Sequence, residues 1–160
     1  MKKLNIEVRI NGASHIATVE PRLTLLDFIR DVAGLNGTHT GCEHGICGAC
    51  SILLDGIPIR ACLMLAVQAD GRRITTVEGL SNSDGTSGIL QDAFIEAHGM
   101  QCGYCTPGMI MAGVGILDQN SNPSESEIRH SLEGNICRCT GYQNIVKAVQ
   151  TASQAMEGGA

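Results

Sequence analysis

The sequence contains eight cysteines in two groups of four, and the first group has the spacing of an iron–sulfur site. Cys42, Cys47 and Cys50 have the spacing C-x4-C-x2-C, and Cys62 follows as a fourth thiol. In this plant-type [2Fe–2S] pattern, one short loop presents three thiolates to two bridged irons and a separate segment supplies the fourth. Glycines among these cysteines let backbone N–H groups approach the cluster sulfurs. A zinc ribbon or four buried thiols are the alternative interpretations.

The second group has a different spacing and leaves two kinds of metal site open. Cys102 and Cys105 form a C-x2-C pair, and Cys137 and Cys139 form a C-x-C pair further along the chain. Each pair precedes an expected helix, so two helix N-termini would point at the site, where their dipoles favour an anionic cluster. Four cysteines also make an ordinary structural zinc site. On chemistry alone, both an iron–sulfur cluster and a zinc ion remain open here.

Composition and charge exclude several other classes of protein. The 160 residues carry a net charge of −5 and only 2% aromatic residues, which argues against a nucleic-acid-binding surface. No apolar stretch approaches the ~18 residues of a membrane span, and none follows Lys2 and Lys3 as in a secretion signal. We therefore expect a cytoplasmic protein with no direct membrane insertion, in which eight cysteines favour metal ligation over disulfides.

The first half of the chain is predicted to be rich in β-strands. Apolar residues alternate with polar ones over 4–10, which is the pattern of a strand with one buried face, and Asn11-Gly12 predicts a hairpin turn. Thr24 is a candidate N-cap of a short helix. Together these elements predict an α+β fold for a first domain over residues 1–78. Further strands are expected at 15–20, 51–54, 57–60 and 73–77.

The second half is predicted to be a small helical bundle, forming a second domain over residues 79–160. Residues 79–88 have the composition of a linker, and residues 106–119 are apolar nearly all round, which predicts a buried helix. Ser124 with Glu127 predicts a capping box for the next helix, and Thr140 with Gln143 predicts another for the last one.

Four segments carry a resemblance to a known family: GCEHGICGAC, Cys62, QCGYCTPGM and ICRCTGYQNI. Together they resemble the iron–sulfur small subunit of the molybdenum hydroxylases, the family of xanthine dehydrogenase and aerobic carbon monoxide dehydrogenase, over about residues 4–152. The resemblance implies an N-terminal β-grasp domain of the plant-type ferredoxin kind and a C-terminal four-helix bundle. It also implies one [2Fe–2S] cluster on Cys42, Cys47, Cys50 and Cys62 and a second on Cys102, Cys105, Cys137 and Cys139.

The resemblance further implies partners for this chain. A large subunit would bind a molybdenum–pterin cofactor and the substrate, a medium subunit would bind FAD, and the complex would be a dimer of heterotrimers. The cluster of the helical domain would lie nearest the pterin, and the other cluster would face the flavin. Gln101, through its side-chain amide, and Cys139 are the residues that would contact the pterin.

The expected function is therefore electron transfer within an oxidoreductase complex, by a subunit with no catalytic residue of its own. Two clusters in series would relay electrons one at a time from the molybdenum–pterin site to FAD or an external acceptor. The alternatives are a stand-alone ferredoxin-like carrier and a zinc-binding structural adaptor. His39 and His44 are expected to be loop residues, and Tyr104 a packing residue.

Overall fold

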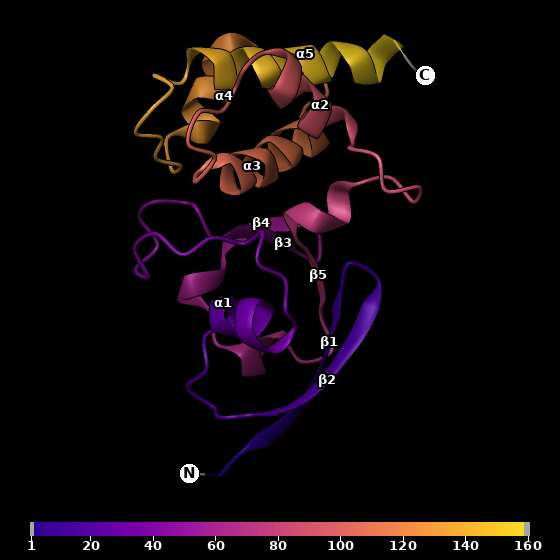
Figure 1. The fold of residues 1–160 in the computed structure, drawn as a ribbon, viewed down its shortest axis with the longest axis vertical. Helices are drawn as coiled ribbons and strands as arrows, with labels where there is room; N and C mark the ends of the chain where they lie inside the picture. The colour runs from indigo at the N-terminus through magenta and orange to yellow at the C-terminus, as the bar shows by residue number, and fades with distance from the viewer. Residues whose placement is uncertain (1, 159–160) are drawn as a thin grey trace.

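The computed structural model describes residues 2–158, so residues 1 and 159–160, at the outer ends of the two expected domains, lie outside the described part. All the strands lie in the first half of that part, and the longer helices lie in the second half (Figure 1). The predicted α+β class is confirmed.

One five-stranded mixed sheet organises the first half, with the strand order β2-β1-β5-β3-β4. β1 pairs with β2 as the predicted antiparallel hairpin and with β5 in parallel, while β3 is antiparallel to both β4 and β5. The alternation in the first strand buries Ile6, Val8 and Ile10, as predicted, whereas Leu4 at its start is exposed. The strands are β1 (Leu4–Ile10), β2 (Ala13–Val19), β3 (Ser51–Leu54), β4 (Ile57–Arg60) and β5 (Arg73–Thr75).

A short helix covers the core of this sheet. Thr24 caps α1 (Leu25–Asp27), because its hydroxyl accepts a hydrogen bond from the Asp27 amide at 3.1 Å, and a π-helical turn continues over Phe28–Val32. Phe28 and Ile29 are fully buried against the sheet. Short 3₁₀ turns complete this half at Ala61–Leu63, Ala66–Ala69 and Val77–Leu80.

Four helices pack around a second hydrophobic core, which includes Phe94, Met109, Ile128, Ile145 and Val149. The capping box at Ser124 and Glu127 is confirmed, with the Ser124 amide donating to the Glu127 carboxylate at 2.8 Å. The helices are α2 (Ile89–Glu96), α3 (Thr106–Gln119), α4 (Glu125–Leu132) and α5 (Gln143–Gly158).

The second predicted capping box is wrong. α5 begins at Gln143 itself, and the Gln143 side chain accepts a hydrogen bond from Arg129 at 2.7 Å instead of reaching back to Thr140. The Thr140 hydroxyl lies 3.0 Å from the sulfur of Cys137. Thr140, predicted from its spacing to cap α5, therefore supports the loop that carries Cys137 instead.

α3 is the helix that joins the two halves, because it packs directly on β3 and β4 (Figure 1). The contact is close at two glycines. A side chain at Gly108 would collide with the backbone of Gly48, and one at Gly115 would collide with Pro58. α3 begins at the second cysteine group and rests on the loop that carries the first, so the fold places the two groups on neighbouring segments.

Candidate metal centres

The four cysteines of the first group come together although Cys62 lies on a separate turn after β4. The thiols of Cys42 and Cys47 interact with each other, those of Cys50 and Cys62 interact with each other, and Cys47 interacts electrostatically with Cys62. Cys50 and Cys62 are buried, whereas Cys42 and Cys47 are only partly so. The first centre is therefore two pairs of sulfurs, one inside the fold and one nearer its surface.

Backbone hydrogen bonds lower the pKa values of these thiols, whereas burial raises them. The Cys47 amide donates to the Cys42 sulfur at 3.4 Å and, with the His44 amide, lowers the pKa of the Cys42 thiol to about 6. Burial raises the pKa of the Cys50 thiol to about 11. The loop thus supplies amide donors to an anionic sulfur at its outer edge, and such donors stabilise an anionic cluster.

The glycines of the loop fit a cluster cradle. A side chain at Gly41 would come within 2.7 Å of the Cys47 sulfur, so only glycine leaves this sulfur room. Gly45 and Gly48 adopt positive φ angles of +82° and +75°, which residues with a Cβ adopt only under strain. The residue types and backbone geometry of this segment therefore fit the group that the spacing predicts.

The second group is assembled in the same way. Cys102 interacts with Cys139, and Cys105 interacts with Cys137. Cys102 and Cys139 are exposed, while Cys105 and Cys137 are partly buried. Cys105 is the N-cap residue of α3, as expected, but α5 starts well after Cys139, so only one helix N-terminus adjoins this centre.

Local hydrogen bonds and burial also give the thiols of the second group different pKa values. Burial raises the pKa of the Cys105 thiol to about 12. Burial also acts to raise the pKa of the Cys137 thiol, but hydrogen bonds from the Thr140 hydroxyl and amide, the Cys139 amide and the Cys105 thiol together outweigh it, so this pKa is lowered. The Tyr104 amide lowers the pKa of the Cys102 thiol.

In both groups the thiols interact within each pair and also across the pairs, so all four sulfurs of a group lie near one another. Within residues 2–158, no group of three or more His, Cys, Asp or Glu side chains is arranged to hold one metal ion. A [2Fe–2S] cluster spreads its four cysteines over two irons, so that each iron takes two sulfurs. The paired arrangement in both groups matches this division.

Other residues singled out from the sequence lie around the second centre. Gln101 immediately precedes Cys102 and is exposed. His39 belongs to a loop, as expected, and Tyr104 does pack, but against His39 across the seam between the two halves. No sequence pattern indicates a role for Arg60 or Asn135. Each precedes a cysteine by two residues, and the structure shows that their side chains are hydrogen-bonded to each other.

Comparison with known families assigns a class to both halves of the chain. The family described as "2Fe-2S iron-sulfur cluster binding domain" matches residues 8–76, and the family described as "[2Fe-2S] binding domain" matches residues 76–150. The fold and the two cysteine groups therefore define an iron–sulfur protein with two [2Fe–2S]-binding domains. None of the helices formed by residues 2–158 is long and apolar enough to cross a membrane.

Similar individual proteins indicate to which family of iron–sulfur proteins the chain belongs. The chain is 51% identical to caffeine dehydrogenase subunit gamma of Pseudomonas sp. strain CBB1, over 95% of this chain and 92% of the relative. It is 49% identical to the nicotine 6-hydroxylase small subunit of Paenarthrobacter nicotinovorans, over 94% and 90%. The solved structure of quinoline 2-oxidoreductase from Pseudomonas putida 86 contains a similar chain, with 46% identity, a TM-score of 0.94 and 99% of each chain covered.

The chain belongs to the family of iron–sulfur small subunits of the molybdenum hydroxylases, which includes those of the xanthine dehydrogenases. Its role is electron transfer through [2Fe–2S] clusters, as a non-catalytic subunit of an oxidoreductase complex. The alternative of a zinc-binding adaptor is thereby set aside.

Proposed function

We propose that this chain relays electrons one at a time from a molybdenum–pterin site on a large subunit, through two [2Fe–2S] clusters, to FAD on a medium subunit or to an external acceptor. A substrate oxidised at molybdenum releases two electrons together, whereas each cluster takes one, so two clusters in series divide the event into single steps. The observation that carries the proposal is the pairing of sulfurs in both cysteine groups, on adjoining segments of one fold.

The ligands follow from these pairs. In the first centre, Cys42 and Cys47 would hold the outer iron, and Cys50 and Cys62 would hold the inner one. In the second centre, Cys102 and Cys139 would hold the iron at the surface, and Cys105 and Cys137 would hold the iron nearer the helices.

The proposed direction of electron transfer rests on which cysteines of the second centre are exposed. Cys102, Cys139 and Gln101 form an exposed edge of the second centre. A side-chain amide donates and accepts hydrogen bonds, which suits the edge of a pterin ring, so Gln101 would bind the pterin and Cys139 would touch it. The second centre would then receive electrons from molybdenum, and the first would pass them to the flavin.

The assembly we propose is a dimer of heterotrimers in the cytoplasm, each trimer with a molybdenum-binding large subunit and an FAD-binding medium subunit. Within the chain, residues 1–78 would form the β-grasp, ferredoxin-like domain and residues 79–160 the four-helix bundle. The pairing of β1 with β5 and the common core of α2–α5 support this division.

The substrate of the complex would be a nitrogen heterocycle. Caffeine, nicotine and quinoline, which the names of the three similar proteins specify, all belong to this class. Reduction of the purified complex by a panel of purines, pyridines, quinolines and simple aldehydes tests this point. Reduction by the aldehydes alone would contradict it.

One experiment tests the relay itself. In the complex with its partner subunits, Cys102→Ala removes a ligand of the second centre, and Cys42→Ala is the matched change in the first. We expect substrate, added without oxygen, to reduce the second cluster in Cys42→Ala but to leave the first cluster oxidised in Cys102→Ala. Dithionite should reduce the remaining cluster in both variants. Reduction of the first cluster by substrate in Cys102→Ala would contradict the proposed order.

A further inference from the structure

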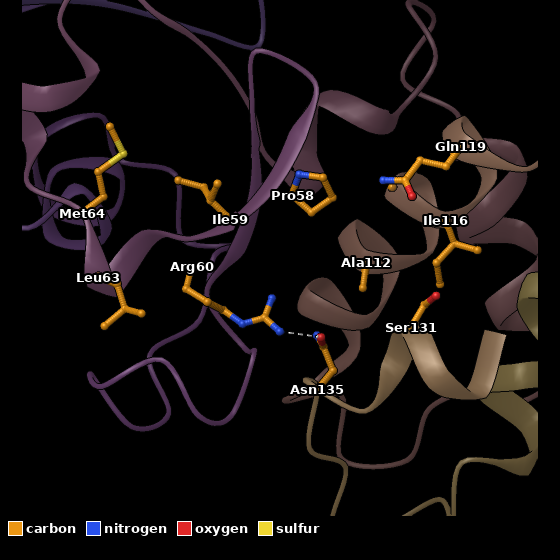
Figure 2. A pocket seen from close by; sticks show the side chains of 11 residues that line it. Pro58, Ile59, Arg60, Leu63, Met64, Ala112, Ile116, Gln119, Ser131 and Asn135 are labelled. Carbon is orange, nitrogen blue, oxygen red and sulfur yellow. Dashed lines mark hydrogen bonds between the residues drawn. The ribbon is translucent and has the colours of Figure 1, made fainter. Parts of the chain in front are cut away.

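The guanidinium group of Arg60 joins segments from both halves of the molecule. Arg60 ends β4, and it donates through Nη1 to the Ser51 hydroxyl at 2.5 Å, beside the first cysteine loop. Through Nη2 it donates to the Gly134 carbonyl at 2.7 Å and to the Asn135 side chain at 3.0 Å. Figure 2 shows the bond to Asn135 at the wall of a cleft of about 700 Å³ between β4 and helices α3 and α4. One side chain therefore ties the loop that precedes Cys137 to the first domain.

The acceptors of Arg60 in turn hold the first cysteine loop. Ser51 donates from its hydroxyl to the Gly48 carbonyl at 2.6 Å, and Asn135 donates to the same carbonyl at 3.3 Å. Nearby, the Ile136 amide donates to the Cys47 carbonyl at 2.9 Å. Gly48 lies inside the first loop and Ile136 immediately precedes Cys137, so the network connects ligand-bearing segments of both centres.

Among the described residues, no acidic side chain is paired with Arg60. All three of its acceptors are neutral, and Arg60 takes part in none of the ion pairs found between residues 2 and 158. An arginine stays protonated at any relevant pH. Arg60 itself is partly buried, and two of its acceptors, Ser51 and Asn135, are 2% and 3% exposed, so water screens the charge less on the side of these acceptors than on the side of the cleft.

A [2Fe–2S] cluster with four thiolate ligands is anionic and gains negative charge on reduction. A positive charge held beside its loop therefore stabilises the reduced form and raises the reduction potential, which depends on net charge and hydrogen bonding around the cluster. Arg60 stands two residues before Cys62, and its acceptor Asn135 stands two residues before Cys137. The guanidinium is thus hydrogen-bonded to the segments that lead into ligands of both centres.

We infer that Arg60 is a positioning residue that fixes the two cysteine loops to each other and, through its charge, raises the reduction potentials of both clusters. The inference rests on the proposed cluster ligands. It adds a residue outside both cysteine groups that sets how readily the two centres accept electrons.

The first test is an anaerobic redox titration of the complex, followed by EPR, on Arg60→Gln. This variant keeps a hydrogen-bonding side chain and removes the charge, so the midpoint potentials of both clusters should become more negative. Arg60→Lys keeps the charge and should stay near the wild-type potentials. Arg72→Gln is the matched control, because Arg72 is paired with Asp55 at the opposite end of the β3–β4 hairpin, and it should shift neither potential.

A second pair of variants tests the charge without touching Arg60. Gly134 is exposed, and a side chain there would approach the flexible end of Arg60, with its Cβ 2.8 Å from Nη2. Gly134→Asp would set a carboxylate against the guanidinium and cancel its charge, whereas Gly134→Ala adds a similar obstruction without charge. Both potentials should fall in Gly134→Asp and fall less in Gly134→Ala.

Iron and sulfide contents separate failure of this inference from failure of the proposed ligands. Wild-type protein without two clusters would refute the ligand proposal itself. Full clusters with unchanged potentials in Arg60→Gln would overturn the role of Arg60. If Arg60→Gln loses iron, the midpoint potentials of the two Gly134 variants provide the test instead. Equal potentials in Gly134→Asp and Gly134→Ala would overturn the inference.

Discussion

The imidazole of His39 lies against the phenol ring of Tyr104, with ring centroids 4.9 Å apart and planes inclined by 33°. The His39 Nδ1 atom donates to the Tyr104 carbonyl at 2.8 Å, and the Tyr104 hydroxyl donates to the Thr40 carbonyl. Tyr104 stands between Cys102 and Cys105, so this contact is a second seam between the two cysteine-bearing halves, separate from Arg60.

Tyr104→Ala is expected to weaken this seam, since it removes both the ring contact and the hydroxyl bond. The two together are worth roughly 1–2 kcal/mol, which corresponds to a fall of a few degrees in the thermal midpoint of the assembled protein. Tyr104→Phe keeps the ring contact and should lose less. Equal midpoints for wild type and Tyr104→Ala, measured at one scan rate, would show that the seam adds no stability.

Gly48→Ala is expected to destabilise the protein by about 2–5 kcal/mol and to release iron from the first centre. Its φ angle is +75°, and the new Cβ would lie 2.7 Å from both the Asn135 side chain and the Gly134 carbonyl. Gly56→Ala is the matched control, because its φ of +87° carries similar strain but its Cβ would meet open space. Thermal midpoints and iron per chain measure the difference, and equal losses in the two variants would contradict a crowded first loop.

Ser124→Ala is expected to cost about 1 kcal/mol of stability without affecting either cluster. The Ser124 hydroxyl accepts from the Glu127 amide at 3.3 Å and donates to the Glu127 carboxylate at 2.6 Å, which caps α4. The variant should show a lower thermal midpoint and faster hydrogen exchange in α4, with unchanged EPR spectra. Altered spectra would mean that α4 is coupled to the metal centres more directly than these contacts indicate.

Gln101→Leu is expected to slow reduction of the second cluster by substrate by about 5- to 150-fold, because an apolar side chain leaves the pterin edge without its partner, a loss of about 1–3 kcal/mol. Rapid-freeze EPR of the complex measures that rate. Iron content and reduction by dithionite should be unchanged. A wild-type rate in this variant would remove Gln101 from the proposed pterin contact.

Most of the fold is encoded in short-range sequence patterns. Strands 51–54 and 57–60, the helix over 106–119 and the Ser124 cap were predictable because each depends on alternation, turn residues or a cap within a few positions. The capping box predicted at Thr140 is wrong because the position of Thr140 is equally suited to capping a helix and to reaching the sulfur of Cys137.

The candidate site was predictable in its ligands but not in its supports. Cysteine spacing is fixed by the chemistry of the cluster, so the eight thiols could be grouped from the sequence alone. The bonds of Arg60 to Gly134 and Asn135 join positions more than seventy residues apart in the sequence. No local sequence pattern encodes such a pairing. From the sequence alone, an arginine near a cysteine is predicted to be an ordinary surface residue, and its role depends on how the two halves pack together.

The most direct test of the two-cluster account is the content of iron, acid-labile sulfide and zinc per chain, together with EPR of the dithionite-reduced protein. The account predicts two irons and two sulfides for each cysteine group, no zinc, and two distinct [2Fe–2S] signals. Two irons with one zinc per chain and a single EPR signal would contradict it. The second cysteine group would then be a structural zinc site, and no cluster would be present there to accept electrons from the molybdenum–pterin site.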